Sequence, residues 1–133
     1  MSFSNYLENE VLDHVTGKGA YTSPTNYVGL SSTTPNENGT GVTEPGAGAY
    51  ARVTTSASDW NAASAGSIAN ANDLTFPTAS ADWVSGSNLT YVVVYDALTS
   101  GNMIYYGQLN TAKAVLNGDT AKIPAGSLTI TLD

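Results

Sequence analysis

The chain contains no cysteine among its 133 residues. Disulfide cross-links and thiolate chemistry are therefore excluded, together with any zinc site that is built on cysteine. Long apolar runs are also missing, because no stretch reaches the ~18 residues of a membrane-spanning helix. Residues 1–17 are polar and acidic, unlike a secretory signal peptide. We therefore expect a protein that folds without covalent cross-links and has no membrane partner.

Positive charge is scarce. Four basic residues stand against eleven acidic ones, which gives a net charge of −7. Proteins that bind DNA or RNA gain affinity by neutralising phosphates with Lys and Arg, so we expect no nucleic-acid partner. Charged residues make up only 11% of the chain, against about a quarter in average domains. Sparse charge with many Thr, Ser and Asn residues indicates a β protein that covers part of its surface by assembly.

One segment near the start of the chain is amphipathic. Residues 4–16, SNYLENEVLDHVT, predict a helix that its first serine or asparagine caps. Leu7, Val11 and Val15 recur at four-residue steps and share one apolar face. A helix this short is marginal on its own. We therefore expect this face to dock on the sheet or on a neighbouring subunit.

Strand patterns dominate the rest of the chain. The expected strands are residues 26–32, 50–56, 67–70, 73–76, 89–97, 103–109 and 127–133. Residues 89–97 are apolar on both faces, which predicts a central strand, and residues 127–133 alternate strictly between apolar and polar. Turns at 97–102 and at Asn117-Gly118 predict two hairpins. The pattern indicates one domain over residues 1–133, an antiparallel β-sandwich or jelly-roll-like fold with one short N-terminal helix.

Residues 31–50 form a long connection with four glycines, two prolines and one branched aliphatic residue, Val42. Such connections are uncommon in compact domains and are usually functional or disordered. An active-site lid needs a site beneath it and a linker needs a second domain after it, and the sequence indicates neither. We predict a contact arm that is mobile in the free protein and becomes ordered on a partner. Its predicted contact residues are Asn36, Glu37, Asn38 and Glu44.

The motifs that carry chemistry are weak. GAGAYA, residues 46–51, has the letters of a dinucleotide fingerprint, but no buried strand precedes it and no helix follows it. His14 is the only histidine and lies near the helix C-terminus, where a cation interacts favourably with the helix dipole. Trp60 and Trp83 suit a sugar-stacking platform, although packing in the core is the simpler interpretation. Paired carboxylates leave a glycosidase formally open, yet we expect no catalytic residue, no cofactor and no metal ligand.

Five segments together carry a resemblance that none of them carries alone. They are SNYLENEVLDHV, AYTSPTNYVGLSSTTP, GAYAR, LTFPTASADW and IYYGQLNTAKAVLNGDTAKIPAGSLTITLD. In combination they resemble a family of small virion structural proteins of tailed bacteriophages, which are labelled tail-fibre-like. Similar small β-rich phage proteins serve as cement, or decoration, subunits on capsids. The resemblance implies a non-enzymatic protein of the virion that assembles in the cytoplasm of a bacterial host.

These observations lead to one main hypothesis and two alternatives. The main hypothesis is a capsid cement protein that binds and stabilises the head shell. Its expected partners are the major capsid protein and sister subunits in a homo-trimer, as the resemblance and the composition suggest. The first alternative is a tail-associated fibre, adhesin or carbohydrate-binding module, and the weaker one is a glycan-degrading enzyme.

Overall fold

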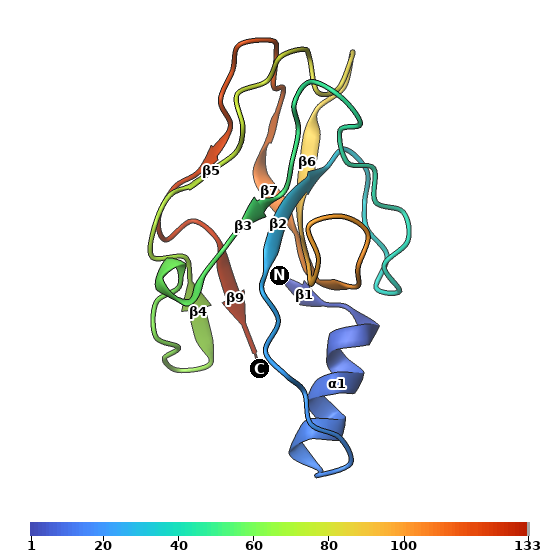
Figure 1. Ribbon diagram of the computed structural model, residues 1–133, viewed down its shortest axis with the longest axis vertical. Helices are drawn as coiled ribbons and strands as arrows, with labels where there is room; N and C mark the ends of the chain where they lie inside the picture. The colour runs from blue at the N-terminus through green and yellow to red at the C-terminus, as the bar shows by residue number, and fades with distance from the viewer. Residues whose placement is uncertain (133) are drawn as a thin grey trace.

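The computed structural model describes residues 1–132 and shows a mainly β protein with one helix (Figure 1). A five-stranded antiparallel sheet has the order β1-β7-β6-β2-β3, and two strand pairs, β4–β9 and β5–β8, lie beside it. The elements are β1 (Ser2–Phe3), α1 (Asn5–Val15), β2 (Tyr27–Ser31), β3 (Val53–Thr54), the 3-10 turn η1 (Ala57–Asp59), β4 (Ser67–Ala69), β5 (Leu74–Thr75), β6 (Leu89–Tyr95), β7 (Met103–Lys113), β8 (Lys122–Ile123) and β9 (Thr129–Thr131). The expected fold class, an antiparallel β-sandwich with one short N-terminal helix, is confirmed.

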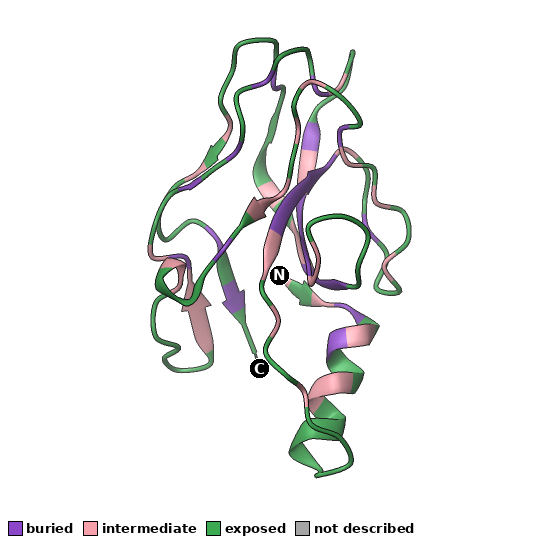
Figure 2. Cartoon of the chain, viewed as in Figure 1, coloured by how far each residue is buried: buried purple, intermediate pink, exposed green. Residues whose placement is uncertain are grey.

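The main core lies between the five-stranded sheet and the two strand pairs. Val28 and Val94 of the sheet are completely buried, and Leu74 and Leu128 of the opposite layer are 3% and 4% exposed. Figure 2 shows the same buried stripe along β2 and β6. Because side chains from both ends of the chain meet there, the two layers depend on each other for their stability.

Strand β6 is central in the sheet, as its sequence predicts. Val92 and Val94 belong to the main core. Val93 and Tyr95 belong to a second, smaller cluster, in which Met103 is also buried. Successive side chains of a strand point to opposite faces, so an apolar side chain at every position requires cover on both sides.

Helix α1 begins where the sequence predicts. Ser4 is its N-cap, because the Leu7 amide donates to Ser4 Oγ at 3.3 Å. The same hydroxyl donates to the carbonyl oxygen of Met103 and so fastens the helix start to β7. The helix ends at Val15, and Gly17 follows the C-cap with a φ of +74°, a conformation that glycine adopts most readily.

The expected hairpin at Asn117-Gly118 is wrong, although the turn itself is present. The Asp119 amide donates to the carbonyl of Leu116 at 2.9 Å, yet the two arms do not pair with each other. Instead, β8 pairs with β5, and the amide of Trp83 donates to the carbonyl of Val115 at 3.0 Å. The predicted turn is therefore present, but the segments on both sides of it pair with more distant parts of the chain.

Two other strand boundaries differ from expectation. The predicted strand 50–56 is reduced to β3. The side chains of Tyr50 and Arg52, which precede β3, make hydrogen bonds to Glu44. At the C-terminus, Ile130 is 8% exposed but Leu132 is 59% exposed, so the alternating run leaves the core before its end. Residue 133 lies outside the described part of the chain.

Candidate functional site

The long connection, residues 31–50, is tied to the body of the protein by an ion pair. The Glu44 carboxylate accepts from Arg52 Nη2 at 2.6 Å and from Arg52 Nε at 3.0 Å, a bidentate contact. It also accepts from the hydroxyl of Tyr50 at 2.6 Å. The Arg52 side chain is 7% exposed and that of Glu44 is 21% exposed. The predicted partner contact Glu44 is therefore engaged inside its own chain.

Arg52 also organises the turn between β6 and β7. Its Nη1 donates to the carbonyl oxygens of Ala97 at 2.7 Å and Ser100 at 2.8 Å. Its guanidinium carbon lies 3.6 Å from the centre of the Tyr95 ring, which is a favourable cation–π position. In the sequence, Arg52 is one of four basic residues and the only arginine. No other sequence feature indicates that it organises these contacts.

Gly29 on β2 makes room for this arrangement. A Cβ atom at Gly29 would lie 2.5 Å from Glu44 Oε1 and 2.8 Å from the Tyr50 hydroxyl. Burial, followed by the neighbouring Glu44 carboxylate, raises the pKa of Tyr50 well above its ordinary value. The hydroxyl is therefore protonated and acts as the hydrogen-bond donor to Glu44. That hydroxyl in turn accepts from the amide of Leu30 at 2.9 Å.

The rest of the connection also packs against the protein, and its predicted mobility in the free protein stays a prediction. Val42 packs against the small cluster on the outer face of the sheet, and the Thr43 amide donates to Ser31 Oγ at 3.0 Å. At the tip, Asn36, Glu37 and Asn38 are exposed. The Glu37 carbonyl accepts from the amide of Asn5 at the start of α1, at 2.9 Å. The connection is thus an ordered cover over the sheet with an exposed tip, and the partner contact of these residues stays a prediction.

The predicted docking face of α1 divides into two halves. Leu7 is buried and Val11 packs partly against the core, but Val15 is 70% exposed. Leu12 beside it is 60% exposed. Figure 2 shows the far half of the helix as exposed, beyond the edge of the sheet. We call Leu12, Val15 and the exposed Leu132 the helix-tip patch.

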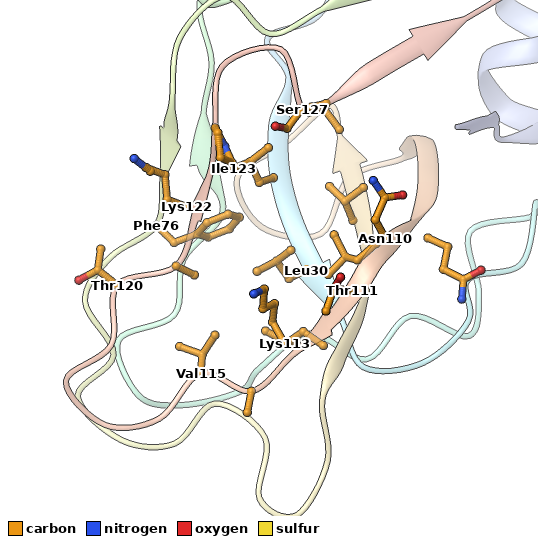
Figure 3. A pocket seen from close by; sticks show the side chains of 18 of the residues that line it. Leu30, Phe76, Asn110, Thr111, Lys113, Val115, Thr120, Lys122, Ile123 and Ser127 are labelled. Carbon is orange, nitrogen blue, oxygen red and sulfur yellow. The ribbon is translucent and has the colours of Figure 1, made fainter.

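A groove with a volume of about 870 Å³ opens between β7 and the chain from Asp119 to Pro124 (Figure 3). Core side chains form its floor, among them Leu30, Phe76, Leu89, Val92 and Leu128. Its two walls are runs of consecutive residues, Gln108–Thr111 and Asp119–Pro124. Since consecutive residues point in alternate directions along a strand, such walls expose strand edges as well as side chains.

Two of the four basic residues lie on this groove. Lys122 pairs with Asp73 at 2.8 Å, and both side chains are about half exposed. Lys113 makes no salt bridge within residues 1–132 and projects into the space between the walls (Figure 3). Asp119 on the opposite wall is the carboxylate among the lining residues. The groove therefore carries one lysine without a salt bridge within residues 1–132, Lys113, while Lys122 is paired and Asp119 adds a carboxylate.

The residues considered for chemistry have other roles. The Trp83 side chain is 5% exposed, stacks edge-on against Tyr50 and Phe76, and donates its ring N–H to Gly48. It is a core residue rather than a sugar platform. His14 is exposed, and its Nδ1 accepts from the amide of Tyr21 at 3.2 Å, which fastens the chain after the helix. The imidazole of His14 therefore has a structural role in holding the segment that follows the helix.

Over residues 1–132, no three His, Cys, Asp or Glu side chains gather closely enough to hold a metal ion. In the same range, no helix has both the length and the apolar character needed to cross a bilayer.

The described residues form an antiparallel β protein with exposed apolar side chains and an open groove. The chain matches the family described as "Podophage GP4 fiber I protein gp80" over residues 2–131. It therefore belongs to this family of phage fibre proteins, and the resemblance to virion structural proteins of tailed phages is confirmed. None of the curated proteins matches the chain significantly.

Proposed function

We propose that this protein is a non-enzymatic structural subunit of a phage tail fibre, which binds sister subunits or neighbouring fibre proteins. The observation that carries this proposal is the family match, which spans residues 2–131 and describes a fibre protein. Two surface features support a role in assembly, namely the helix-tip patch and the groove. Low charge density agrees with a surface that other subunits cover in part.

Capsid cement is the second candidate, and the tip of residues 31–50 favours it. Asn36, Glu37 and Asn38 project from an ordered cover that the Glu44–Arg52 pair holds in place. A pre-ordered tip loses less conformational entropy on binding than a mobile arm would. In this role the tip would contact the major capsid protein, and the subunits would form a homo-trimer on the shell.

Mass spectrometry of separated heads and tails distinguishes the two candidates. A fibre subunit is expected in the tail fraction and absent from heads purified before tail joining. A cement subunit is expected on those heads in high copy number. Recovery from heads alone would overturn the fibre proposal.

The tip is tested by changing Glu37 to Ala. Its side chain is exposed and makes no hydrogen bond within residues 1–132, so the variant is expected to fold and melt as the parent does. If the tip is the contact, occupancy on virions falls while the variant remains folded. Unchanged occupancy would exclude the tip as the contact. Thr34→Ala, which changes another exposed residue of the same connection, serves as the matched control.

A further inference from the structure

We propose that the far half of α1 of one copy docks into the groove of a second copy, so that subunits join head to tail. This inference deepens the proposed fibre role by naming the partner and both surfaces. It concerns the purified protein, so its failure would leave the location in the virion untouched.

The first argument is apolar complementarity. Leu12 and Val15 are 60% and 70% exposed on a helix that extends beyond its own sheet. The groove has about 870 Å³ of space, and its lining includes the partly exposed apolar side chains of Leu109, Ala121 and Ile123. Apolar surface gains free energy when it leaves water. The helix-in-groove arrangement, in which an amphipathic helix lays its apolar side on an apolar floor, is a common mode of recognition.

The second argument is charge. Helix α1 carries three carboxylates, Glu8, Glu10 and Asp13, while the groove carries Lys113, which makes no salt bridge within residues 1–132. In a chain of net charge −7, most contacts between two copies bring like charges together. Contact between α1 and the groove instead places the carboxylates of the helix near an unpaired lysine. Complementary potentials of this kind select the register and suppress other contacts.

A helix suits the groove better than an added strand does. Strand β1 covers only Tyr105 and Tyr106 on the outer edge of β7. The remaining edge carries Lys113, and the pairing with β6 shifts register between Leu89 and Tyr91. Lysine on an edge strand and an irregular register both discourage strand addition. The edge is therefore protected against strand pairing, while the partly exposed apolar side chains of Leu109, Ala121 and Ile123 remain accessible.

The two surfaces are formed by different residues of the molecule, although Met1 lies beside both. A contact between two different surfaces is heterologous, and it propagates until a ring closes or a filament grows. Such a contact explains how a small subunit builds an elongated structure.

The absence of cysteine allows a direct test by cross-linking. Val15→Cys and Thr111→Cys are made as separate single-cysteine variants, since both positions are exposed. They are then mixed and treated with a short bis-maleimide. The proposal expects a cross-linked dimer from the mixture and none from either variant alone. Leu98→Cys, exposed elsewhere on the surface, is mixed with Thr111→Cys as the matched control for random collisions.

Each other outcome of this experiment overturns the proposal. Cross-linking of Val15→Cys alone means that two helices meet. Cross-linking of Thr111→Cys alone means that two β7 edges meet. A yield from the mixture no higher than from the Leu98→Cys control means that there is no specific contact.

A charge swap provides an independent test by sedimentation velocity. Lys113→Glu is expected to weaken self-association about tenfold, which corresponds to about 1.4 kcal/mol. Adding Asp13→Lys to the same chain should restore much of the loss, because each contact then regains opposite charges. Thr99→Glu, which adds a negative charge at an exposed position in the turn between β6 and β7, should lie closer to the parent. A parent protein that stays monomeric at its highest soluble concentration, or a swap without recovery, would contradict the docking.

Discussion

Glu44 and Arg52 form the contact on which the order of residues 31–50 depends. Removing one partner of a pair this buried leaves the other charge uncompensated. We predict that Glu44→Gln lowers the free energy of unfolding by about 2–4 kcal/mol, since the Arg52 side chain is only 7% exposed. Urea unfolding at neutral pH measures the loss. Asp73→Asn breaks the exposed pair with Lys122 and is expected to cost much less, because solvent screens that pair, so equal losses would contradict the assignment.

Two tyrosines provide a second test at the scale of the residue. The Tyr50 hydroxyl donates to Glu44 and accepts from Leu30, so Tyr50→Phe removes both of these hydrogen bonds and should cost about 1–3 kcal/mol. The hydroxyl of Tyr21 is buried and has no hydrogen-bond partner within residues 1–132. Tyr21→Phe is therefore expected to be neutral or slightly stabilising. Thermal melting of both variants measures the difference, and a reversed order would show that the hydroxyl roles are misassigned.

At the scale of the element, α1 is half docked and half free. Val11 packs against the core, so Val11→Asp places a charge against apolar neighbours and should cost about 2–4 kcal/mol. Val15 is 70% exposed, so Val15→Asp should change the stability of the monomer by less than about 0.5 kcal/mol. Urea unfolding of dilute protein keeps association out of both measurements. A large loss for Val15→Asp under those conditions would mean that the helix docks along its whole length.

At the scale of the whole molecule, two carboxylates link stability to acid. Hydrogen bonds from the Ser56 amide and then from Asn72 hold the pKa of Asp59 below its ordinary 3.8. Hydrogen bonds from Lys122 and then from the Ala125 amide do the same for Asp73. A pKa that is lower in the folded state gives stability that is present above pH 3.8 and is lost as the pH falls below it.

The corresponding prediction concerns Asp59→Asn combined with Asp73→Asn. The double variant should be less stable than the parent at neutral pH, and the difference should shrink as the pH is lowered below about 4. Urea unfolding across this range measures both free energies of unfolding. A difference that grows toward acid pH would contradict the sign.

The fold class and the position of its main elements could be predicted from the sequence. Helix α1, its cap and the central strand β6 follow from patterns within a few residues, because capping and periodicity depend on near neighbours. The unusual length and composition of the connection at residues 31–50 are also visible in the sequence, but its contacts with the sheet are not. Two residues of the predicted helix face, Leu7 and Val11, pack against the core, whereas Val15 is exposed.

Only the tertiary structure decided which partners these segments take. The arms of the Asn117-Gly118 turn pair with β5 and with Trp83 instead of each other. Glu44 meets Arg52 because β3 and the long connection converge beside Gly29. The groove exists because β7 continues past the cover that β1 provides. Each of these depends on which backbone edges and surfaces meet across the chain, and local patterns carry no information about those distant choices.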